Sequence, residues 1–378
     1  MTQRGRWTLA LLTAVLIGAA IYVSTPRRTD RPAGIGGLLY PALGVSLDEV
    51  TSIRILGPGG TTAVTLERAE NGWRVAERAG YPADASRVRA LLLGLAQART
   101  IEEKTTLPAN YPSLGVEDLA TPGATGTGVE LAGPAEPVSL IVGKSPGARA
   151  SYIRRKGEAA SWQIGTALTV ERDPAKWLAT ELLDIGADRI QSAEFTMDGK
   201  RRWTVAKTSR ADQNFKVTGK PAGGSGADAE SSAGRVATAL GGLRLVDVRP
   251  AEGMAKDKPA ATATYRTFDG LVLVIDGYAE GDKRFVRVKP SADETAARRF
   301  FVAAVAPAGK DDAADSTPPK PPAAEASGAK SAPAKSPESV VAQTREEATK
   351  PETRLAGWWF EIPDWSYDAV FPGKPVRP

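Results

Sequence analysis

The stretch that organises the chain runs Asp84-Ala-Ser-Arg-Val-Arg-Ala-Leu-Leu-Leu-Gly-Leu-Ala-Gln-Ala-Arg99. Its apolar residues recur at i, i+3, i+4 and i+7 and form one stripe: Val88, Leu91, Leu92 and Leu95. Asp84 stands where a carboxylate accepts hydrogen bonds from the free N–H groups of a helix start. The pattern therefore predicts an amphipathic helix whose stripe packs on a sheet.

Short strands are predicted on both sides of this helix. Apolar and polar residues alternate at 53–55, 64–66 and 73–75, and Gly59-Gly60 and Asn71-Gly72 lie between these runs. Asn-Gly between alternating runs is a strong hairpin signal because both positions tolerate positive φ. Beyond Ile101 we expect a loop and then strands at 129–131, 138–142, 152–153 and 162–164. A second helix is predicted from Asp173-Pro174, with its apolar face made by Trp177, Leu178, Leu182 and Ile185.

The same arrangement recurs in the second half of the chain. Ala193 and Phe195 stand 140 positions after Ile53 and Ile55. The helical stripe recurs at an offset of 148, in Val236, Ala239, Leu240 and Leu243. The strand at 245–248 fits an offset of 145 better, which would shorten this helix by one turn. Residues 271–275 follow 138–142 by 133, and so do Phe285 and Arg287 after Tyr152 and Arg154. Trp358 and Phe360 are predicted to form the last strand of the second copy, in the places that Trp162 and Ile164 have in the first.

We therefore predict an α+β fold with two tandem copies of an antiparallel β-meander, each with one packed helix, and an N-terminal transmembrane helix. The expected domains are an anchor with its cytoplasmic tip (1–25), a juxtamembrane spacer (26–44), a first copy (45–187) and a second copy (188–378). The second copy is interrupted at 306–353, which is rich in Ala, Pro, Lys, Ser and Glu and has no aromatic residue. This composition predicts a disordered linker, helical near Glu338–Glu347.

The predicted anchor is the uncharged segment Trp7–Val23, at the short end of the transmembrane range. A cleavable signal peptide is the main alternative, but the apolar run continues through Ile21, Tyr22 and Val23 without a cleavage pattern. A buried core helix is less favoured because both flanks are rich in arginine. The flanking charges are nearly balanced, so the expected orientation rests on the rule that long C-terminal domains translocate regardless of charge. The chain is thus expected to be a single-pass protein of the bacterial inner membrane with its bulk extracytoplasmic.

Composition excludes several functional classes. The chain has 49 basic and 44 acidic residues, but five arginines and one aspartate in residues 1–31 account for +4 of the net +5. The remainder has no basic excess for nucleic acid. It contains no cysteine and no histidine, so disulfides, thiolate metal sites and histidine catalysis are absent. We expect no enzyme, no catalytic residue, no cofactor and no metal.

Three local patterns bear on function. Gly143-Lys144-Ser145 resembles the end of a phosphate-binding loop, but Val138 stands where the first glycine is needed and Pro146 would break the helix, so a turn is predicted. The carboxylate clusters Glu102-Glu103, Asp311-Asp312 and Asp364 with Asp368 are expected to be solvated surface. The candidate partner-contact residues lie near the C-terminus and are Trp359, Trp365 and Tyr367. Alternation along the strand would leave Trp359 facing away from the core.

Several motifs together resemble one bacterial family of unknown function, the domain numbered four-three-four-zero. They are Asn71-Gly-Trp-Arg-Val75, Tyr81-Pro-Ala-Asp84, Glu102-Glu-Lys-Thr105, Tyr111-Pro-Ser-Leu-Gly-Val-Glu-Asp118, Val142-Gly-Lys-Ser145, Tyr152-Ile-Arg154 and Trp177-Leu178. The resemblance covers most of 45–190 and, more weakly, the second copy. It implies an accessory role beside ABC-type exporters of the gliding-motility kind, and it assigns no catalytic residue.

The leading expectation is a membrane-anchored accessory or scaffold protein of an envelope complex, associated with ABC-type transporter subunits. One alternative is an envelope hydrolase that uses a carboxylate pair. The other is a module that binds glycan or peptide through an exposed aromatic cleft.

Overall fold

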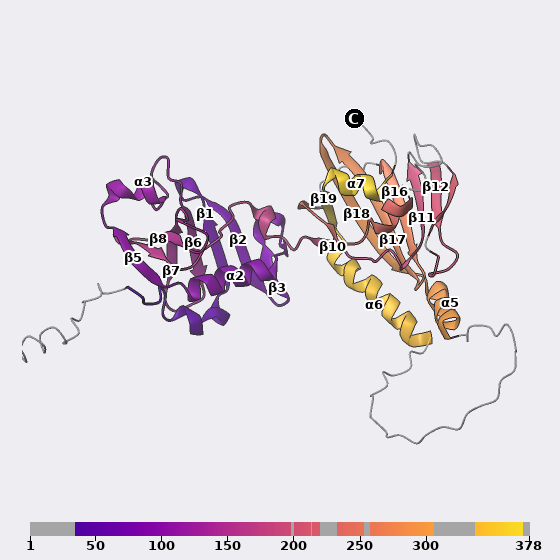
Figure 1. The fold of residues 1–378 in the computed structure, drawn as a ribbon, viewed down its shortest axis with the longest axis horizontal. Coiled ribbons are helices and arrows are strands. Elements are labelled where there is room, and N and C mark those ends of the chain that lie inside the picture. Colours follow the sequence, from indigo (N-terminus) through magenta and orange to yellow (C-terminus); the bar gives the residue numbers. More distant parts are fainter. Residues whose placement is uncertain are drawn as a thin grey trace, which may run out of the picture. The chain divides into compact units, whose positions relative to one another are not determined.

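The computed structural model describes residues 35–197, 200–212, 214–219, 233–252, 258–305 and 337–372. The chain divides into two compact units (Figure 1): residues 1–68 with 86–172, and residues 69–85 with 173–378. The predicted anchor Trp7–Val23 lies outside the described residues. Within those ranges, no helix combines the length and the apolar character that a membrane crossing requires.

The fold consists mostly of antiparallel sheets with a few helices, so the α+β class is confirmed. The first sheet has the strand order β4-β3-β2-β1-β6-β7-β8-β9-β5. Its strands are β1 (Ser52–Leu56), β2 (Thr62–Ala69), β3 (Gly72–Val75), β4 (Tyr81–Pro82), β5 (Thr100–Thr105), β6 (Thr127–Ala132), β7 (Val138–Val142), β8 (Ser151–Arg155) and β9 (Ser161–Ile164).

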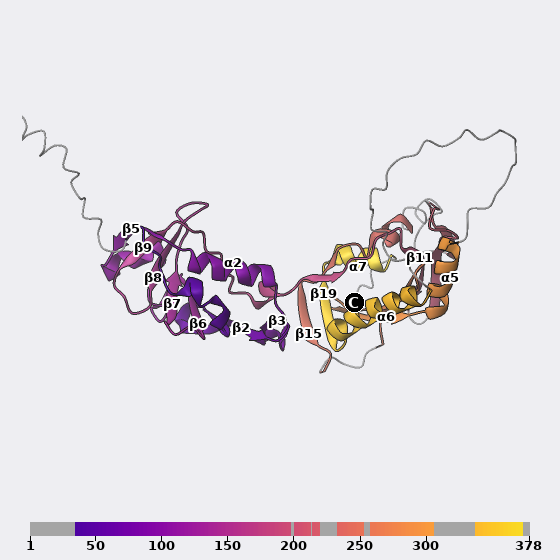
Figure 2. The ribbon, with the colours of Figure 1, turned by 90° about the horizontal axis from the view of Figure 1, so that it is seen from below.

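Local sequence explains the elements around the central strand. The turn at Asn71-Gly72 has the positive φ that only glycine adopts readily, 107° at Gly72. Ile53 and Ile55 are fully buried, as the period-two pattern predicts. Helix α2 (Ala85–Ala96) runs along one face of the sheet (Figure 2), and its predicted stripe is buried: Val88, Leu91, Leu92 and Leu95.

Two sequence predictions in this region are wrong. Residues 102–105, part of the loop expected beyond Ile101, belong to the terminal strand β5; its polar sequence Thr-Ile-Glu-Glu-Lys-Thr has no apolar alternation to reveal it. The helix expected from Asp173 is only a 3₁₀ turn, η6 (Pro174–Trp177), although Asp173 does cap it by accepting from the Ala175 N–H. Beyond the turn, Leu178 bridges Ala83, and strand β10 (Glu181–Leu183) buries Leu182, so the apolar residues of this stretch pack in extended backbone.

The second sheet has the order β13-β12-β11-β16-β17-β18-β19-β15. Its strands are β11 (Ile190–Met197), β12 (Lys200–Ala206), β13 (Lys216–Gly219), β15 (Asp247–Pro250), β16 (Ala261–Thr267), β17 (Leu271–Glu280), β18 (Lys283–Ala292) and β19 (Trp358–Ile362). Apart from β4, this order matches that of the first sheet strand for strand, with β11 in the place of β1.

Strand register extends the match to individual residues. Ile53 of β1 pairs with Leu66 on one side and Leu131 on the other. In the same way, Ala193 of β11 pairs with Val205 and Tyr265. The offset of 140 between Ile53 and Ala193 therefore joins two residues at the same position in their sheets.

Two other offsets predicted from the sequence differ by two residues from those that the strand pairings give. Leu140 pairs with Val129 as Ile275 pairs with Ala263, so β17 follows β7 by 135 and not by 133. Trp162 pairs with Ile153 as Phe360 pairs with Val286, so Trp162 corresponds to Phe360 and not to Trp358. A shift of two keeps every side chain on its face, so the hydrophobic pattern could not distinguish these registers.

A lead-in segment precedes each sheet. Leu38 bridges Arg99, and Glu181 of β10 pairs with Arg244 of β14 (Leu243–Arg244), which lies 145 positions after Arg99. Residues 35–44, expected to be part of a spacer, therefore pack with the first unit and bury Leu39, Tyr40 and Leu43.

The helix of the second unit ends at residue 238, earlier than a stripe through Leu243 requires and in keeping with the shortening that the offset of 145 predicts. Its described residues are 233–238, and Val236 and Leu240 are buried as expected. Ala239 is partly exposed, and Leu243 lies in β14 rather than on the helix. The four residues predicted to form one helical stripe therefore lie in a helix, a turn and a strand.

The predicted linker interrupts a hairpin. In the first unit, residues 156–160 join β8 to β9, whereas β18 and β19 are separated by residues 293–357. This insertion contains helices α5 (Glu294–Val305) and α6 (Pro337–Leu355), which pack on each other (Figure 1). The helix expected near Glu338–Glu347 is confirmed. The disorder expected over 306–353 is wrong for 337–353, and residues 306–336 lie outside the described residues. The reason is a buried stripe at helical spacing: Val341, Thr344, Ala348 and Leu355.

We expect Leu95→Ala to destabilise the first unit by about 2–5 kcal/mol, because it leaves a cavity under a fully buried side chain. Leu93→Ala is the matched control on the same helix. Leu93 is 40% exposed, so its loss should cost less than about 0.5 kcal/mol. Urea unfolding of both variants measures the difference, and equal costs would contradict the packing of this stripe.

Candidate functional site

Of the three residues predicted to contact a partner, only Trp365 is accessible. Trp359 is buried, because the ring of Tyr278 packs edge-on against it with centroids 3.9 Å apart. Tyr367 is also buried: its ring contacts Phe371, and burial raises the pKa of its hydroxyl to about 12. Trp365 lies on helix α7 (Asp364–Val370) and is 74% exposed.

Glycine permits α7 to pack this closely. A Cβ at Gly277 in β17 would come within 2.7 Å of the Phe371 ring and of the Tyr367 hydroxyl. Tyr265 also reaches this helix, since its hydroxyl donates to the carbonyl of Val370 at 3.2 Å. The helix is therefore held firmly on the sheet while Trp365 remains in solvent.

Two of the predicted carboxylate clusters fall among the described residues, one in β5 and one in α7. Glu102 forms an ion pair with Lys104 at 3.1 Å, and Asp311-Asp312 lies outside the described residues. Asp364 and Asp368 lie on one short helix, so they cannot approach a glycosidic bond from opposite sides. Burial, followed by the charge of Asp364, raises the pKa of the Asp368 carboxyl. Arg284 lies 3.9 Å from Asp364 and partly offsets that charge.

Three of the motifs that carry the family resemblance meet in the first unit: Tyr111–Asp118, Val142–Ser145 and Tyr152–Arg154. The Arg154 guanidinium lies 4.6 Å from the ring centre of Tyr111 and donates to the carbonyls of Val116 and Glu158. It also pairs with Asp118 at 2.5 Å, and its side chain is only 4% exposed. Arg154 thus fastens the segment after α3 (Tyr111–Leu114) to strand β8.

Gly143-Lys144-Ser145 forms part of the same cluster and lies in the β7–β8 connection, as predicted. Lys144 Nζ donates to the carbonyls of Pro112 and Ser113 at 3.1 Å each, where the end of α3 leaves free acceptors. A Cβ at Gly143 would lie 2.3 Å from the carbonyl oxygen of Leu114. This glycine is therefore required by close packing, and the lysine holds backbone rather than phosphate.

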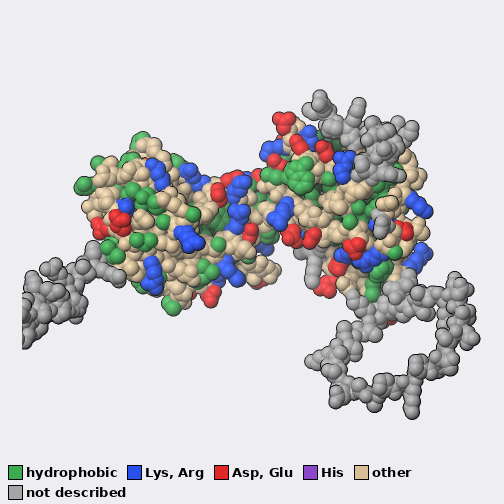
Figure 3. All heavy atoms as spheres, viewed as in Figure 1, with side chains coloured by type: hydrophobic (Ala, Val, Ile, Leu, Met, Phe, Trp, Pro, Cys, Tyr) green, Lys and Arg blue, Asp and Glu red, His purple; other side chains and the backbone are tan. Residues whose placement is uncertain are grey.

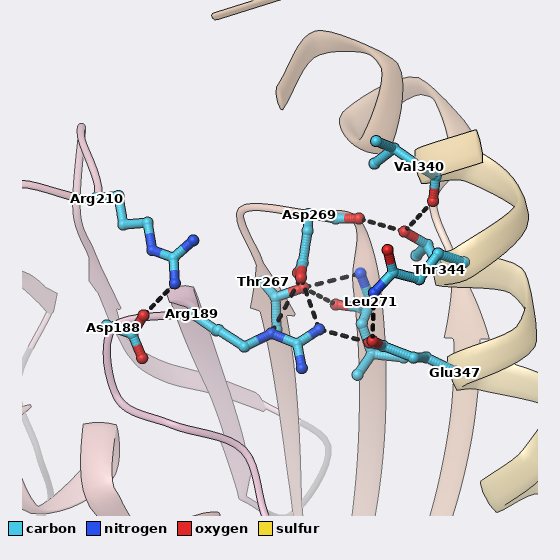
Figure 4. Close-up of polar contacts among 10 residues, drawn as sticks. Asp188, Arg189, Arg210, Thr267, Asp269, Leu271, Val340, Thr344 and Glu347 are labelled. Atoms are coloured by element: carbon cyan, nitrogen blue, oxygen red, sulfur yellow. Dashed lines mark hydrogen bonds and ion pairs between the residues drawn. The ribbon is translucent and has the colours of Figure 1, made fainter. Parts of the chain in front are cut away.

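A second polar cluster joins the inserted helix to the second sheet (Figure 4). Arg189 donates from Nε and Nη2 to Asp269 Oδ2, at 3.0 and 2.6 Å, and from Nη2 to Glu347 Oε2 at 2.6 Å. Thr344 Oγ1 donates to the carbonyl of Asp269 at 2.8 Å. Burial lowers the pKa of Arg189, but the hydrogen bond to Glu347 and the two carboxylate charges outweigh it and raise the pKa. This cluster anchors α6.

Sequence reasoning missed the cluster around Arg189. Its members are 80 and 158 residues apart along the chain, and no local pattern connects them. One sequence feature could have drawn attention to Arg154: an arginine recurs at the corresponding position of the second copy, Arg287, at an offset of 133. Their positions agree in the structure, because Arg154 pairs with Ile141 and Arg287 with Asp276.

The face drawn in Figure 3 shows no continuous patch of one charge sign among its described residues. Basic and acidic side chains are interspersed over the face drawn in Figure 3. Across the part of the chain that the structure describes, no group of acidic residues is arranged to hold a metal ion.

We expect Arg154→Met to destabilise the first unit by about 2 kcal/mol, because two backbone carbonyls lose a buried donor. Hydrogen exchange should accelerate over residues 106–119. Lys156→Met is the control, since Lys156 is an exposed residue that pairs with Glu130 on the neighbouring part of the sheet. Unchanged exchange in the Arg154 variant would contradict the fastening role.

Glu347→Gln should loosen α6, because the remaining amide cannot form the ion pair with Arg189. The expected cost is about 0.5–1 kcal/mol, since the carboxylate is partly exposed. Faster hydrogen exchange confined to 337–355 would show it. Glu338→Gln, an exposed position on the same helix, should leave exchange unchanged. Equal behaviour of the two variants would mean that the pair does not hold the helix.

The comparisons with known proteins identify a family without assigning an activity. The model of the family described as Domain of unknown function (DUF4340) matches residues 73–266, just over half of the 378 residues. No curated protein and no solved structure matched the chain. The matched range extends from β3 in the first half of the chain to β16 in the second, and it contains the resemblance motifs from Tyr81-Pro-Ala-Asp84 to Trp177-Leu178. The chain is therefore a member of the DUF4340 family.

Proposed function

We propose that this chain is an accessory or scaffold protein of a bacterial envelope complex, built from two copies of one α+β module. Trp7–Val23 would hold it in the inner membrane with both modules outside the cytoplasm. Its partners would be subunits of an ABC-type transporter. No step of chemistry is assigned to it.

One observation carries the proposal. The polar clusters around Arg154, Lys144 and Arg189 each fasten one backbone segment to another. Catalytic groups would instead be expected to face a cavity where substrate can reach them. These three clusters hold segments of the fold together, which is a structural role that a scaffold requires.

The membrane and transporter parts of the proposal rest on the sequence. The uncharged segment near the N-terminus supports an anchor, and the family resemblance supports a transporter partner. The nearly neutral remainder of the chain is consistent with a protein partner rather than nucleic acid.

Trp365 favours a second candidate function, a module that binds peptide or glycan. An exposed indole offers a large apolar surface with a polar N–H at its edge, which suits both kinds of ligand. The hydrolase alternative has weaker support, because the carboxylate pair Asp364 and Asp368 comes from a single helix.

Affinity purification of the tagged chain from membranes in mild detergent tests the proposal. Transporter subunits should be recovered with the wild-type chain. Recovery of the chain alone would contradict the scaffold function. Trp365→Ala should reduce recovery if this indole contacts the partner, whereas Val45→Ala, another highly exposed apolar position, should not.

A further inference from the structure

Strands β5 and β15 occupy the same position, next to β9 and β19, at the end of their sheets. Glu102 pairs with Gln163 as Asp247 pairs with Glu361. One residue further on, Glu103 pairs with Trp162 as Val248 pairs with Phe360. The two edges can therefore be compared residue by residue.

The edge of the second unit is covered. Residues 69–85 belong to this unit, and their Arg78 donates to both oxygens of Asp247, at 2.6 and 3.0 Å. The ring of Tyr81 packs edge-on against Trp358 and Phe360, with centroid distances of 5.1 and 6.1 Å. Beneath this cover, Val248 and Phe360 are buried.

The equivalent edge of the first unit is open. Glu103 is exposed and Trp162 is partly exposed, although their counterparts Val248 and Phe360 are buried. The side chain of Glu102 is 57% exposed, against 24% for Asp247. Two further apolar side chains are exposed nearby, Ile101 at 48% and Leu107 at 62%.

The lead-in segment of the first unit, residues 35–44, covers only the beginning of β5. Its hydrogen bonds join Gly36 and Gly37 to the backbone of Thr100. Among the described residues, no strand follows β5 in the sheet order, so its outer edge is available for pairing. An open strand edge with apolar side chains is a typical docking surface for an extended peptide.

We propose that the β5–β9 edge, defined as Ile101, Glu102, Glu103, Leu107 and Trp162, binds a hairpin of a partner protein that presents an arginine and an aromatic ring. The arginine would pair with Glu102 as Arg78 pairs with Asp247. The ring would pack on Trp162 as Tyr81 packs on Phe360. A second copy of this chain is the less suitable occupant, because its own hairpin is already engaged by its own second unit.

This inference deepens the proposed scaffold function and rests on its duplicated module. The two can fail separately. If purification recovers transporter subunits equally well with an altered β5–β9 edge, the scaffold function stands and the docking edge is wrong.

The probe for this edge is a fluorescent peptide of residues 69–85, closed by a disulfide between added terminal cysteines so that it keeps its hairpin. The full-length chain should bind it saturably. Glu102→Lys/Glu103→Lys should weaken binding at least tenfold, because both changed charges would repel the arginine. Glu67→Lys, an exposed acid on β2, is the matched control and should bind like the wild type.

Two further binding measurements, one with a changed peptide and one with a changed chain, decide where the peptide binds. A peptide carrying Arg78→Glu and Tyr81→Ala should not bind. The chain variant Asp247→Lys should still bind, since it alters only the covered edge. Absence of saturable binding to the wild-type chain would overturn the proposal. So would loss of binding in Asp247→Lys with retention in Glu102→Lys/Glu103→Lys, because the peptide would then be displacing the hairpin of the second unit.

Discussion

The rest of the fold depends on the pairing of β1 with β6, and of β11 with β16. β1 forms a hairpin with β2, which is close in sequence, but its other neighbour starts more than seventy residues later. This pairing positions Ile53 between Leu66 and Leu131, and Ala193 between Val205 and Tyr265. Each long-range ladder aligns an early hairpin with a later run of strands, so one buried face extends across both. The helix between them then has a continuous apolar surface on which to pack.

The insertion between β18 and β19 shows how the second module accommodates extra chain without losing its sheet. β19 still pairs with β18 and β15, although residues 293–357 separate it from β18. The cluster of Arg189, Asp269 and Glu347 fixes α6 beside the sheet through partly buried charges. A surface ion pair contributes little by itself, but two carboxylates on one guanidinium, together with the buried stripe of α6, make this contact specific. The tolerance of the sheet to the insertion agrees with its position in a hairpin turn.

Sequence patterns predicted the elements whose burial is periodic. The strands around Ile53 and Ile55, the hairpin at Asn71-Gly72 and the stripe of α2 follow from the periods of a strand and a helix. Strand β5 could not be predicted, because Glu102 and Glu103 are exposed and break the pattern. The offset of β17 was misjudged because a register shift of two preserves the face. The exposure predicted for Trp359 is wrong because Tyr278 covers it, a contact between strands far apart in sequence. Charged clusters joined by long-range contacts leave no local signal.

The two sheets are copies of one module in a defined register, and engineered disulfides test this equivalence directly because the chain has no cysteine. Glu130 pairs with Ser139 in β6 and β7, and Thr264 pairs with Val274 in β16 and β17. Directly opposed positions on antiparallel strands lie within the distance that a disulfide spans. Cysteines at 130 and 139, and at 264 and 274, should both cross-link on mild oxidation. A variant with cysteines at 264 and 272 should not cross-link. If that pair cross-links and the pair at 264 and 274 does not, the register is wrong, and so is the residue-by-residue equivalence of the two units.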